Sequence, residues 1–269
     1  MRKIALVNQK GGVGKTTTAV NLSAALARLG KRVLLVDLDP QSNATVSFGI
    51  VPHELKNTTY TLLCNDIKSN DVIRKVADNL FLIPSNIDLA GAELELSTAI
   101  GRESVLKDAM EGVDNFDFIF VDCPPSMGIL NVNGLTYVDE VFIPLQCEFF
   151  ALHGISLLLR TIDLVKKRLN PTLTISGIIP CMFDIRKGLS KEVISEIEAF
   201  FKEKVFKTRI RVNVRLAEAP SHGKSIFDYA PDSYGAEDYM NLAKEILGII
   251  TPLSNASVDN QISPILKQI

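Results

Sequence analysis

Short apolar runs recur along the chain and alternate with longer segments in which apolar residues repeat at helical spacing. The runs predict buried strands at residues 4–7, 33–36, 80–84, 116–122, 138–144, 173–179 and 205–210. The helical spacing predicts helices at residues 19–29, 87–100, 103–111, 152–169, 191–201 and 236–250, with Ser190 as the N-cap of the helix that follows it. Strands that alternate with helices favour an α/β fold, with a mostly parallel, twisted sheet and helices on both of its faces.

Two parts of the chain depart from this alternation. Residues 45–78 are less regular and contain short helical stretches at 60–64 and 72–76, so we expect an exposed excursion of the fold there. Residues 251–269 carry two prolines among small polar residues, which is typical of a flexible or loosely packed tail. No linker divides the remainder, and we therefore expect one domain over residues 1–250.

Composition and charge bound the class of protein. Hydrophobic residues make up 46% of the 269 positions and charged residues 22%, which is ordinary for a soluble globular protein. The net charge is -2, so any binding of nucleic acid has to come from a local basic patch. No apolar run approaches the ~20 residues of a membrane span. The basic start leads directly into the first strand, and we expect no signal peptide there.

The four cysteines, Cys64, Cys123, Cys147 and Cys181, are widely scattered and form no Cys-x-x-Cys pair. They are typical of reduced thiols in a cytoplasmic protein, not of a disulfide framework or a metal site. Cys147 has no His or Asn near it in a recognisable catalytic pattern, and we interpret it as a buried thiol.

A glycine-rich segment lies between the first strand and the first helix, in the context that a phosphate-binding loop requires. It consists of Lys10, Gly11, Gly12, Val13, Gly14, Lys15, Thr16 and Thr17. Glycines allow the backbone to curve around an anion and to turn its N–H groups inward, and the helix that follows directs its positive end to the same place. Lys15 can reach the β- and γ-phosphates of a nucleotide, and the Thr16 hydroxyl is placed to bind Mg²⁺. The segment predicts a P-loop NTPase fold.

Acidic residues end two of the predicted strands. Asp39 follows strand 33–36, and Asp122 ends strand 116–122. Parallel sheets bind their ligands at this edge, so Thr16, Asp39 and Asp122 form a predicted Mg²⁺ site beside Lys15, suited to attack of water on a γ-phosphate. For Asp39 the alternative is that its carboxylate caps the next helix. No Asn-Lys-x-Asp motif occurs in the chain, which favours ATP over GTP.

The loop departs from the usual Gly-x-x-x-x-Gly-Lys-Ser/Thr pattern, because Gln9 stands in place of the first glycine and Lys10 adds a second lysine. In this it resembles the deviant Walker A loop of the ParA/Soj partitioning ATPases, within the wider ParA/MinD class. The Asp-Cys-Pro-Pro-Ser segment at 122–126, the Gln-Cys-Glu-aromatic-aromatic-Ala segment at 146–151 and residues 212–224 are also similar to that family. The resemblance extends from Lys3 to about Ile250.

The resemblance implies roles in nucleotide chemistry. In the family, the first lysine, here Lys10, crosses a dimer interface and contacts the partner subunit's nucleotide, and the aspartate at Asp39 orients the attacking water. Met182 and Asn213 correspond to nucleotide contacts, although Arg211 and Val212 replace the family's Pro-Arg before the asparagine. We therefore expect weak intrinsic ATP hydrolysis, catalysed by Lys10, Lys15 and Asp39, and an ATP-driven sandwich homodimer that separates after hydrolysis.

The resemblance also implies partners. Such proteins bind double-stranded DNA without sequence preference when dimeric, through arginines that match Arg186 and Arg215, with Lys187, Arg209, Arg211 and Lys224 as plausible neighbours. A ParB-type centromere-binding protein stimulates hydrolysis and releases the dimer. We expect no membrane partner and a cytoplasmic, nucleoid-associated location.

Three other functions remain open. A MinD-like regulator of the division site needs a membrane-binding helix, whereas residues 262–269 are short and interrupted by Pro264. An iron–sulfur carrier needs paired interface cysteines, and Cys123 has no second cysteine close in sequence. An ATP-dependent ligase of cofactor biosynthesis needs a second substrate pocket, which the sequence does not reveal.

Overall fold

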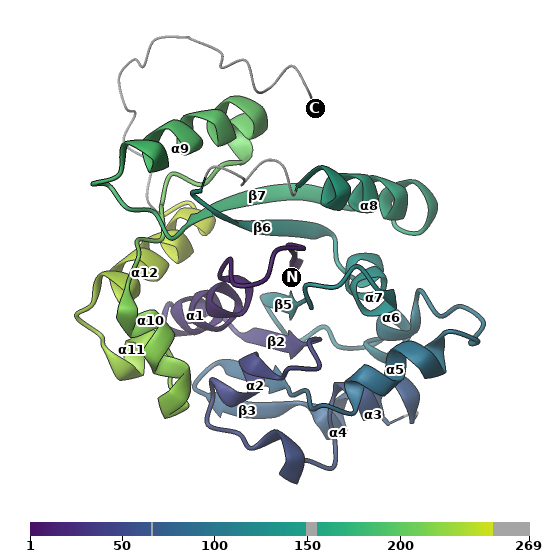
Figure 1. The fold of residues 1–269 in the computed structure, drawn as a ribbon. Helices are drawn as coiled ribbons and strands as arrows, with labels where there is room; N and C mark the ends of the chain where they lie inside the picture. The colour runs from purple at the N-terminus through teal and green to yellow at the C-terminus, as the bar shows by residue number, and fades with distance from the viewer. Residues whose placement is uncertain (66, 149–154, 250–269) are drawn as a thin grey trace.

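The computed structural model describes residues 1–65, 67–148 and 155–249, and Figure 1 shows them as a sheet wrapped by helices. The tail predicted at 251–269 lies outside the described residues, as do positions 152–154 of the predicted helix 152–169.

The sheet has seven strands in the order β3-β4-β2-β5-β1-β6-β7. Its strands are β1 (Arg2–Leu6), β2 (Val33–Asp37), β3 (Arg74–Ala77), β4 (Leu80–Ile83), β5 (Phe118–Asp122), β6 (Glu140–Gln146) and β7 (Thr174–Cys181). All neighbours run parallel except β3 and β4, which pair antiparallel at one edge. The predicted α/β class with a mostly parallel sheet is therefore confirmed.

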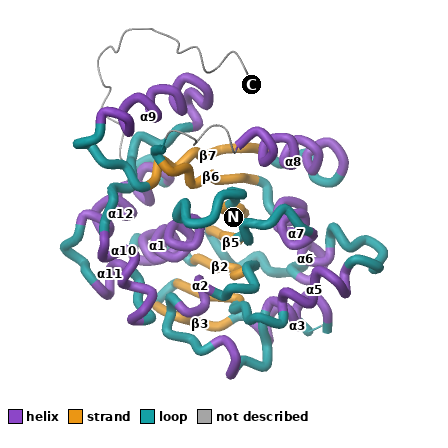
Figure 2. Tube along the Cα trace, viewed as in Figure 1, coloured by secondary structure: helices purple, strands orange, loops and turns teal. Residues whose placement is uncertain are grey.

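Helices cover both faces of this sheet, which explains why its central strands are apolar without alternation (Figure 2). Ile4 and Leu6 of β1 contribute to one core, and Ala5 between them contributes to the other. The first core is shared with α1 (Lys15–Arg28), α10 (Val214–Glu218), α11 (Ile226–Tyr229) and α12 (Tyr234–Ile246). The second is shared with α3 (Thr59–Cys64), α5 (Leu89–Leu96), α6 (Val105–Ala109), α7 (Ile129–Tyr137), α8 (Ile155–Arg168) and α9 (Gly188–Phe201). Short helices α2 (Asn43–Val46) and α4 (Ser69–Val72) complete the irregular region.

The strand predicted at 205–210 is wrong. The backbone N–H groups of Phe206 and Ile210 do bond to carbonyl groups of β7, at 3.0 and 2.8 Å. Between them, however, the N–H groups of Lys207 and Thr208 donate to the carboxylate of Glu245, at 2.7 and 2.9 Å. Thr208 is the donor between Phe206 and Ile210 that a continuous ladder with β7 would need, so only isolated bridges form.

Three further differences concern helices. Residues 72–76 are not helical, because α4 ends at Val72 and the edge strand β3 follows. Ser190 is not an N-cap, because α9 begins at Gly188 and the Ser190 side chain is buried. Helix α7 was not predicted, since buried Asn131 and Asn133 interrupt its apolar spacing; both amides donate to backbone carbonyl groups instead.

Candidate active site

The carboxyl ends of three adjacent strands bring the predicted site together. Leu6 at the end of β1 and Asp37 at the end of β2 both pair with Asp122 at the end of β5. The glycine-rich loop, which follows β1, and Asp39, which follows β2, therefore meet beside Asp122. They border a hollow of about 420 Å³. Of the predicted nucleotide and metal residues, Gly11, Gly12, Gly14, Lys15, Thr16, Thr17, Asp39 and Met182 line this hollow, whereas Lys10, Val13, Asp122 and Asn213 do not.

The loop has the backbone of an anion-binding turn. Gly12 and Gly14 have φ of +73° and +94°, in the left-handed region that favours glycine, while Val13 between them is buried in the protein. Helix α1 begins directly at Lys15, and no side chain caps its N-terminus. The first N–H groups of this helix therefore lack intrahelical partners and lie at the hollow, where an anion can accept from them.

Lys15 places its ammonium group among carboxylates. The residue is buried, and its Nζ lies 3.5 Å from the carbonyl oxygen of Lys10. Burial lowers the pKa of Lys15, whereas the carboxylates of Asp122 and Asp39 act in the opposite direction. A buried cation with so few bonds of its own is suited to meet the oxygens of a phosphate group.

Asp122 is fully buried, and neither of its carboxylate oxygens has a hydrogen-bond partner within the described residues. Burial raises the pKa of Asp122 well above its ordinary value, and the nearby Asp37 adds to this. The charge of Lys15 acts against it, as does the hydroxyl of Thr16, which is near the carboxylate but makes no hydrogen bond of ordinary geometry with it. Since a buried orphan carboxylate is unfavourable, this arrangement suits a hydrated divalent cation beside Thr16. Among the residues that the structure describes, no group of three or more His, Cys, Asp or Glu side chains clusters as a metal site would require.

Asp37, not Asp39, anchors the next helix. The Asp37 carboxylate accepts from the backbone N–H and the hydroxyl of Thr45 in α2, at 2.8 and 2.6 Å, and from the N–H of Asp39 at 3.3 Å. Burial raises the pKa of Asp37 to about 7. Asp39 accepts from the N–H of Gln41, at 2.9 Å, and borders the hollow. The sequence left open that Asp39 caps the next helix, but the carboxylate that bonds to that helix belongs to Asp37. The catalytic role of Asp39 stays a prediction.

Lys10 lies outside the hollow. Its Nζ donates to Gln146 Oε1 at 3.0 Å and to Glu148 Oε2 at 3.2 Å, and its side chain is 50% exposed. In this conformation the ammonium group is directed to the end of the chain's own β6. The predicted contact with a partner subunit's nucleotide requires these bonds to break.

The nucleotide contacts predicted at 182 and 213 differ in position. Met182 lines the hollow, but Asn213 does not, because its Oδ1 accepts from the N–H of Arg215 and caps α10. An apolar wall of Leu216, Ala217 and Pro220 stands there instead, together with Lys224. These three apolar residues were not among the predicted site residues, although their spacing within a polar segment was a usable signal.

The four arginines among the basic residues proposed for DNA divide into two groups. Arg186 and Arg215 are exposed, at 84% and 58% of the side chain, and each pairs with a single nearby carboxylate, Asp184 and Glu218 respectively. Arg209 and Arg211 are engaged within the fold, where they pair with Glu198 and with Asp238 and Glu237. The first two are therefore the more available for phosphate groups.

Two predictions about other residues can be compared with the structure. The four cysteines are free of disulfides, and burial raises the pKa of Cys147 to about 12, so this thiol is held neutral and is not an activated nucleophile. Within the described ranges, no helix combines the length and apolar character needed to cross a membrane.

Comparison of this sequence with those of known proteins identifies a matching family model and several similar proteins. A family model described as an AAA domain matches residues 1–175. The sporulation initiation inhibitor protein Soj of Bacillus subtilis is 54% identical over 90% of this chain and 97% of its own length. The chromosome-partitioning ATPase Soj of Treponema pallidum is 49% identical over 91% and 97%.

Solved structures agree with this fold. One named cobyrinic acid a,c-diamide synthase, from Mycobacterium smegmatis with bound ADP and magnesium, superposes with a TM-score of 0.81 at 38% identity, over 92% of this chain and 94% of its own. An ATP complex of a McdA variant from Cyanothece gives 0.82 at 25% identity, over 94% and 99%. Because identity to the Soj proteins is high and spans nine-tenths of the sequence, the chain belongs to the Soj/ParA family of chromosome-partitioning ATPases.

Proposed function

We propose that this protein is an ATPase that uses Mg²⁺ and ATP to switch between a monomer and a DNA-binding dimer. The observation that carries the proposal is the buried Asp122 carboxylate, which lacks a hydrogen-bond partner beside Thr16 and Lys15 at the open N-terminus of α1. A site with unsatisfied donors for an anion and an unsatisfied acceptor for a cation suits a magnesium nucleotide better than any single ion.

Each residue then has a chemical role. The N–H groups of the loop and the ammonium of Lys15 bind the β- and γ-phosphates, and the apolar wall at Leu216 and Pro220 faces the remainder of the nucleotide. Thr16 and Asp122 would hold Mg²⁺, directly or through water, and the ion when bound would supply positive charge to neutralise the phosphate groups. Asp39 orients the water that attacks the γ-phosphorus, whose bond to the β-phosphate oxygen breaks, so that ADP and phosphate leave.

The remaining steps of the proposed cycle depend on formation of a dimer. In the dimer, Lys10 leaves Gln146 and Glu148 and neutralises the partner's triphosphate, which stabilises the sandwich with ATP more than with ADP. Arg186 and Arg215 of both subunits contact DNA phosphates, and intrinsic hydrolysis is slow until a ParB-type protein stimulates it. With DNA as the partner, we propose a cytoplasmic, nucleoid-associated location. The names of the Soj relatives support partitioning as the process.

Sedimentation of an Asp39→Ala variant with ATP tests this proposal, with and without DNA. We expect a stable dimer that retains DNA and does not hydrolyse ATP, because binding survives while orientation of water is lost. Lys15→Gln is the control, since it should form no dimer. An Asp39→Ala chain that stays monomeric at saturating ATP would contradict the sandwich.

The alternatives from the sequence have their own tests. ATP-dependent flotation with liposomes would favour a MinD-like regulator instead. The name of the Mycobacterium smegmatis structure suggests amide synthesis for that protein. ATP hydrolysis without any added acid or amine would separate the present proposal from a ligase.

A further inference from the structure

The apolar wall of the nucleotide hollow is carried by a segment with little support of its own. Leu216 and Ala217 of this wall lie in α10, a helix of only five residues. Its N-cap is Asn213, whose side chain accepts from the N–H of Arg215 at 2.9 Å. So short a helix is not stable by itself in water. The contacts that hold this segment therefore determine the position of the wall.

Helix α12 holds the segment through one buried carboxylate. Asp238 is 4% exposed, and it accepts from Nε of Arg211 at 3.0 Å and from Nη2 at 2.5 Å. The same carboxylate accepts from the backbone N–H of Arg211 at 2.9 Å. Glu237 accepts from the guanidinium at 2.6 Å, and the ring centre of Tyr234 lies 4.2 Å from it. Because Asp238 binds the backbone as well as the side chain, it fixes the main chain two residues before the N-cap of α10.

The same segment borders the end of β7. The N–H of Phe183 donates to the carbonyl of Ile210 at 3.0 Å, and the N–H of Val212 donates to the carbonyl of Phe183 at 3.2 Å. Met182, immediately before Phe183, lines the hollow and has φ of +54°. This conformation is unfavourable for a residue other than glycine unless its surroundings hold it. The segment that α12 holds therefore supports Met182 on one side and α10 on the other.

Helix α12 also contacts the wall directly. A Cβ built at Gly235 would meet three carbon atoms of the Leu216 side chain, at 2.8, 3.1 and 3.2 Å. Since Leu216 borders both α12 and the hollow, a larger residue at position 235 would displace it. Tyr239, which is buried, shares a hydrogen bond of 3.1 Å with the hydroxyl of Thr18 in α1, three residues after Lys15. Helix α12 thus contacts both the apolar wall and the helix that begins at the phosphate-binding loop.

We propose that Asp238 and Gly235 are positioning residues for the nucleotide, which set the distance between the phosphate-binding loop and the apolar wall. Neither residue lines the hollow, so Asp238 acts through Arg211, and Gly235 acts through Leu216. The inference rests on the proposed function, because it assumes that a nucleotide occupies the hollow. Arg211, considered from the sequence as a neighbour of the DNA contacts, then serves the nucleotide site instead.

Binding of ADP with Mg²⁺ to the full chain tests Asp238, because ADP occupies the hollow without requiring the dimer. For Asp238→Asn, we expect the Kd for ADP to rise roughly tenfold, as for loss of a charge-assisted contact. The value of kcat at saturating ATP should change by less than about twofold, because the wall binds substrate and transition state equally.

Glu198→Gln is the control for Asp238→Asn. It removes the ion pair of Arg209, which lies on the same segment but faces α9. The side chains of Arg209 and Arg211 are similarly exposed, at 30% and 35%. Neither the Kd for ADP nor kcat should change in Glu198→Gln.

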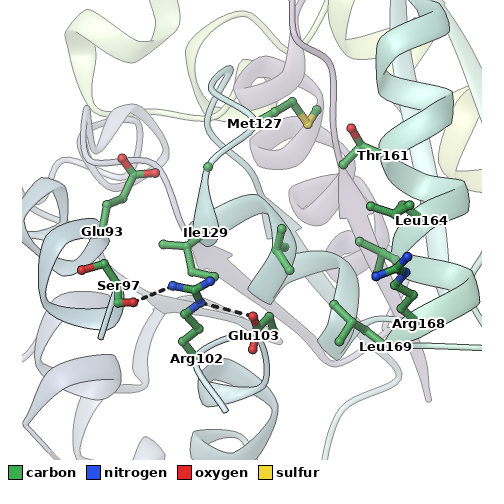
Figure 3. A pocket seen from close by; sticks show the side chains of 13 residues that line it. Glu93, Ser97, Arg102, Glu103, Met127, Ile129, Thr161, Leu164, Arg168 and Leu169 are labelled. Carbon is green, nitrogen blue, oxygen red and sulfur yellow. Dashed lines mark hydrogen bonds and ion pairs between the residues drawn. The ribbon is translucent and has the colours of Figure 1, made fainter. Parts of the chain in front are cut away.

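Gly235→Ala tests the wall without a change of charge. Alanine favours a helix more than glycine does, so a weaker helix would not explain weaker binding. We expect the Kd for ADP to rise here too, because Leu216 is displaced. Gly91→Ala is the control: Gly91 is also helical, in α5 beside the separate groove between α5, α7 and α8 (Figure 3), and the nearest atom to its Cβ position, in Glu95, is 3.8 Å away.

Urea unfolding establishes that each variant is folded under the conditions of the binding measurement. An unchanged Kd for ADP in either Asp238→Asn or Gly235→Ala would overturn the proposal, as would a fall in kcat that matched the rise in Kd. If the unaltered chain bound no ADP, the proposed function itself would fail, and the role of α12 with it.

Discussion

The ammonium group of Lys10 lies 3.2 Å from the carboxylate of Glu148 in the same chain, beside the amide oxygen of Gln146 at 3.0 Å. Glu148 also accepts from the amide of Gln146, at 2.7 Å. The side chain that the dimer model assigns to a partner's nucleotide is thus held by its own subunit. Release of Lys10 becomes one component of the free energy of dimerisation.

Glu148→Gln should therefore favour the ATP dimer. Each of the two subunits releases one such pair, and an exposed ion pair contributes up to about 1 kcal/mol, so the concentration of protein at half-dimerisation should fall by no more than about thirtyfold. Analytical ultracentrifugation with ATP measures this. Asp78→Asn is a matched control, since it removes an exposed ion pair, to Lys75, far from the nucleotide hollow. A weaker dimer in Glu148→Gln would show that Glu148 supports the dimer instead of restraining Lys10.

Stability of the chain without nucleotide or Mg²⁺ should depend on the protonation of Asp37. Its pKa is raised by burial to about 7, above the unfolded value, so the folded state binds more protons and its stability falls as pH rises through about 7. Between roughly pH 5 and pH 7, Asp37 should contribute a loss of up to about 1.4 kcal/mol per pH unit. Urea unfolding across this range measures the slope, and Asp37→Asn should flatten it. An unchanged slope in that variant would assign the dependence to other groups.

Gly223→Ala should destabilise the fold and weaken nucleotide binding. Gly223 has φ of +61°, and a Cβ there would meet the backbone nitrogen of Gly49 at 2.8 Å, in the turn after α2. Both turns adjoin residues that line the nucleotide hollow, because Val46 lies shortly before Gly49 in the chain and Pro220 lies shortly before Gly223. Gly112→Ala is the control, because Gly112 has φ of +78° but open space around its Cβ position. Backbone strain should lower the free energy of unfolding of both variants by about 1–2 kcal/mol. Gly223→Ala should lower it further and should also weaken ATP binding, whereas Gly112→Ala should do neither. Equal losses in urea unfolding would mean that the contact adjusts freely.

Arg215→Glu should weaken DNA binding by similar factors for unrelated sequences while ATP-driven dimerisation is unchanged. The side chain is 58% exposed, and contacts of this kind to phosphate release counterions. For the neutral variant Arg215→Gln, the slope of log affinity against log salt should decrease in magnitude by about 1. Arg209→Gln provides the comparison, since that guanidinium pairs with Glu198 and lies 4.9 Å from the ring centre of Phe183. Fluorescence anisotropy with two DNA duplexes of unrelated sequence measures these affinities. An Arg215→Gln variant that kept the original salt slope would contradict the assignment of Arg215 to DNA.

Much of the fold could be predicted because its signals are local. The apolar runs that became β1, β2 and β5 and the glycine-rich loop after β1 depend on short stretches of sequence. The strand expected at 205–210 failed because a carboxylate nearly forty residues away, Glu245, takes two of its N–H groups. The distinction between Asp37 and Asp39 depends likewise on Thr45 in a helix that the pattern did not define. The contact between Gly235 and Leu216 joins two helices, and no spacing along the chain reveals it.

Strand β5 lies between β1 and β2 at the centre of the sheet. Its backbone bonds to both neighbours hold Asp122 at a constant distance from the start of the loop that carries Lys15 and from the end of the strand that precedes Asp39. Any local opening that separated these groups would have to disrupt the most interior ladder of the molecule. The cycle proposed above therefore needs no rearrangement of these three strands, and the one change that it requires, release of Lys10 from Gln146 and Glu148, lies outside them.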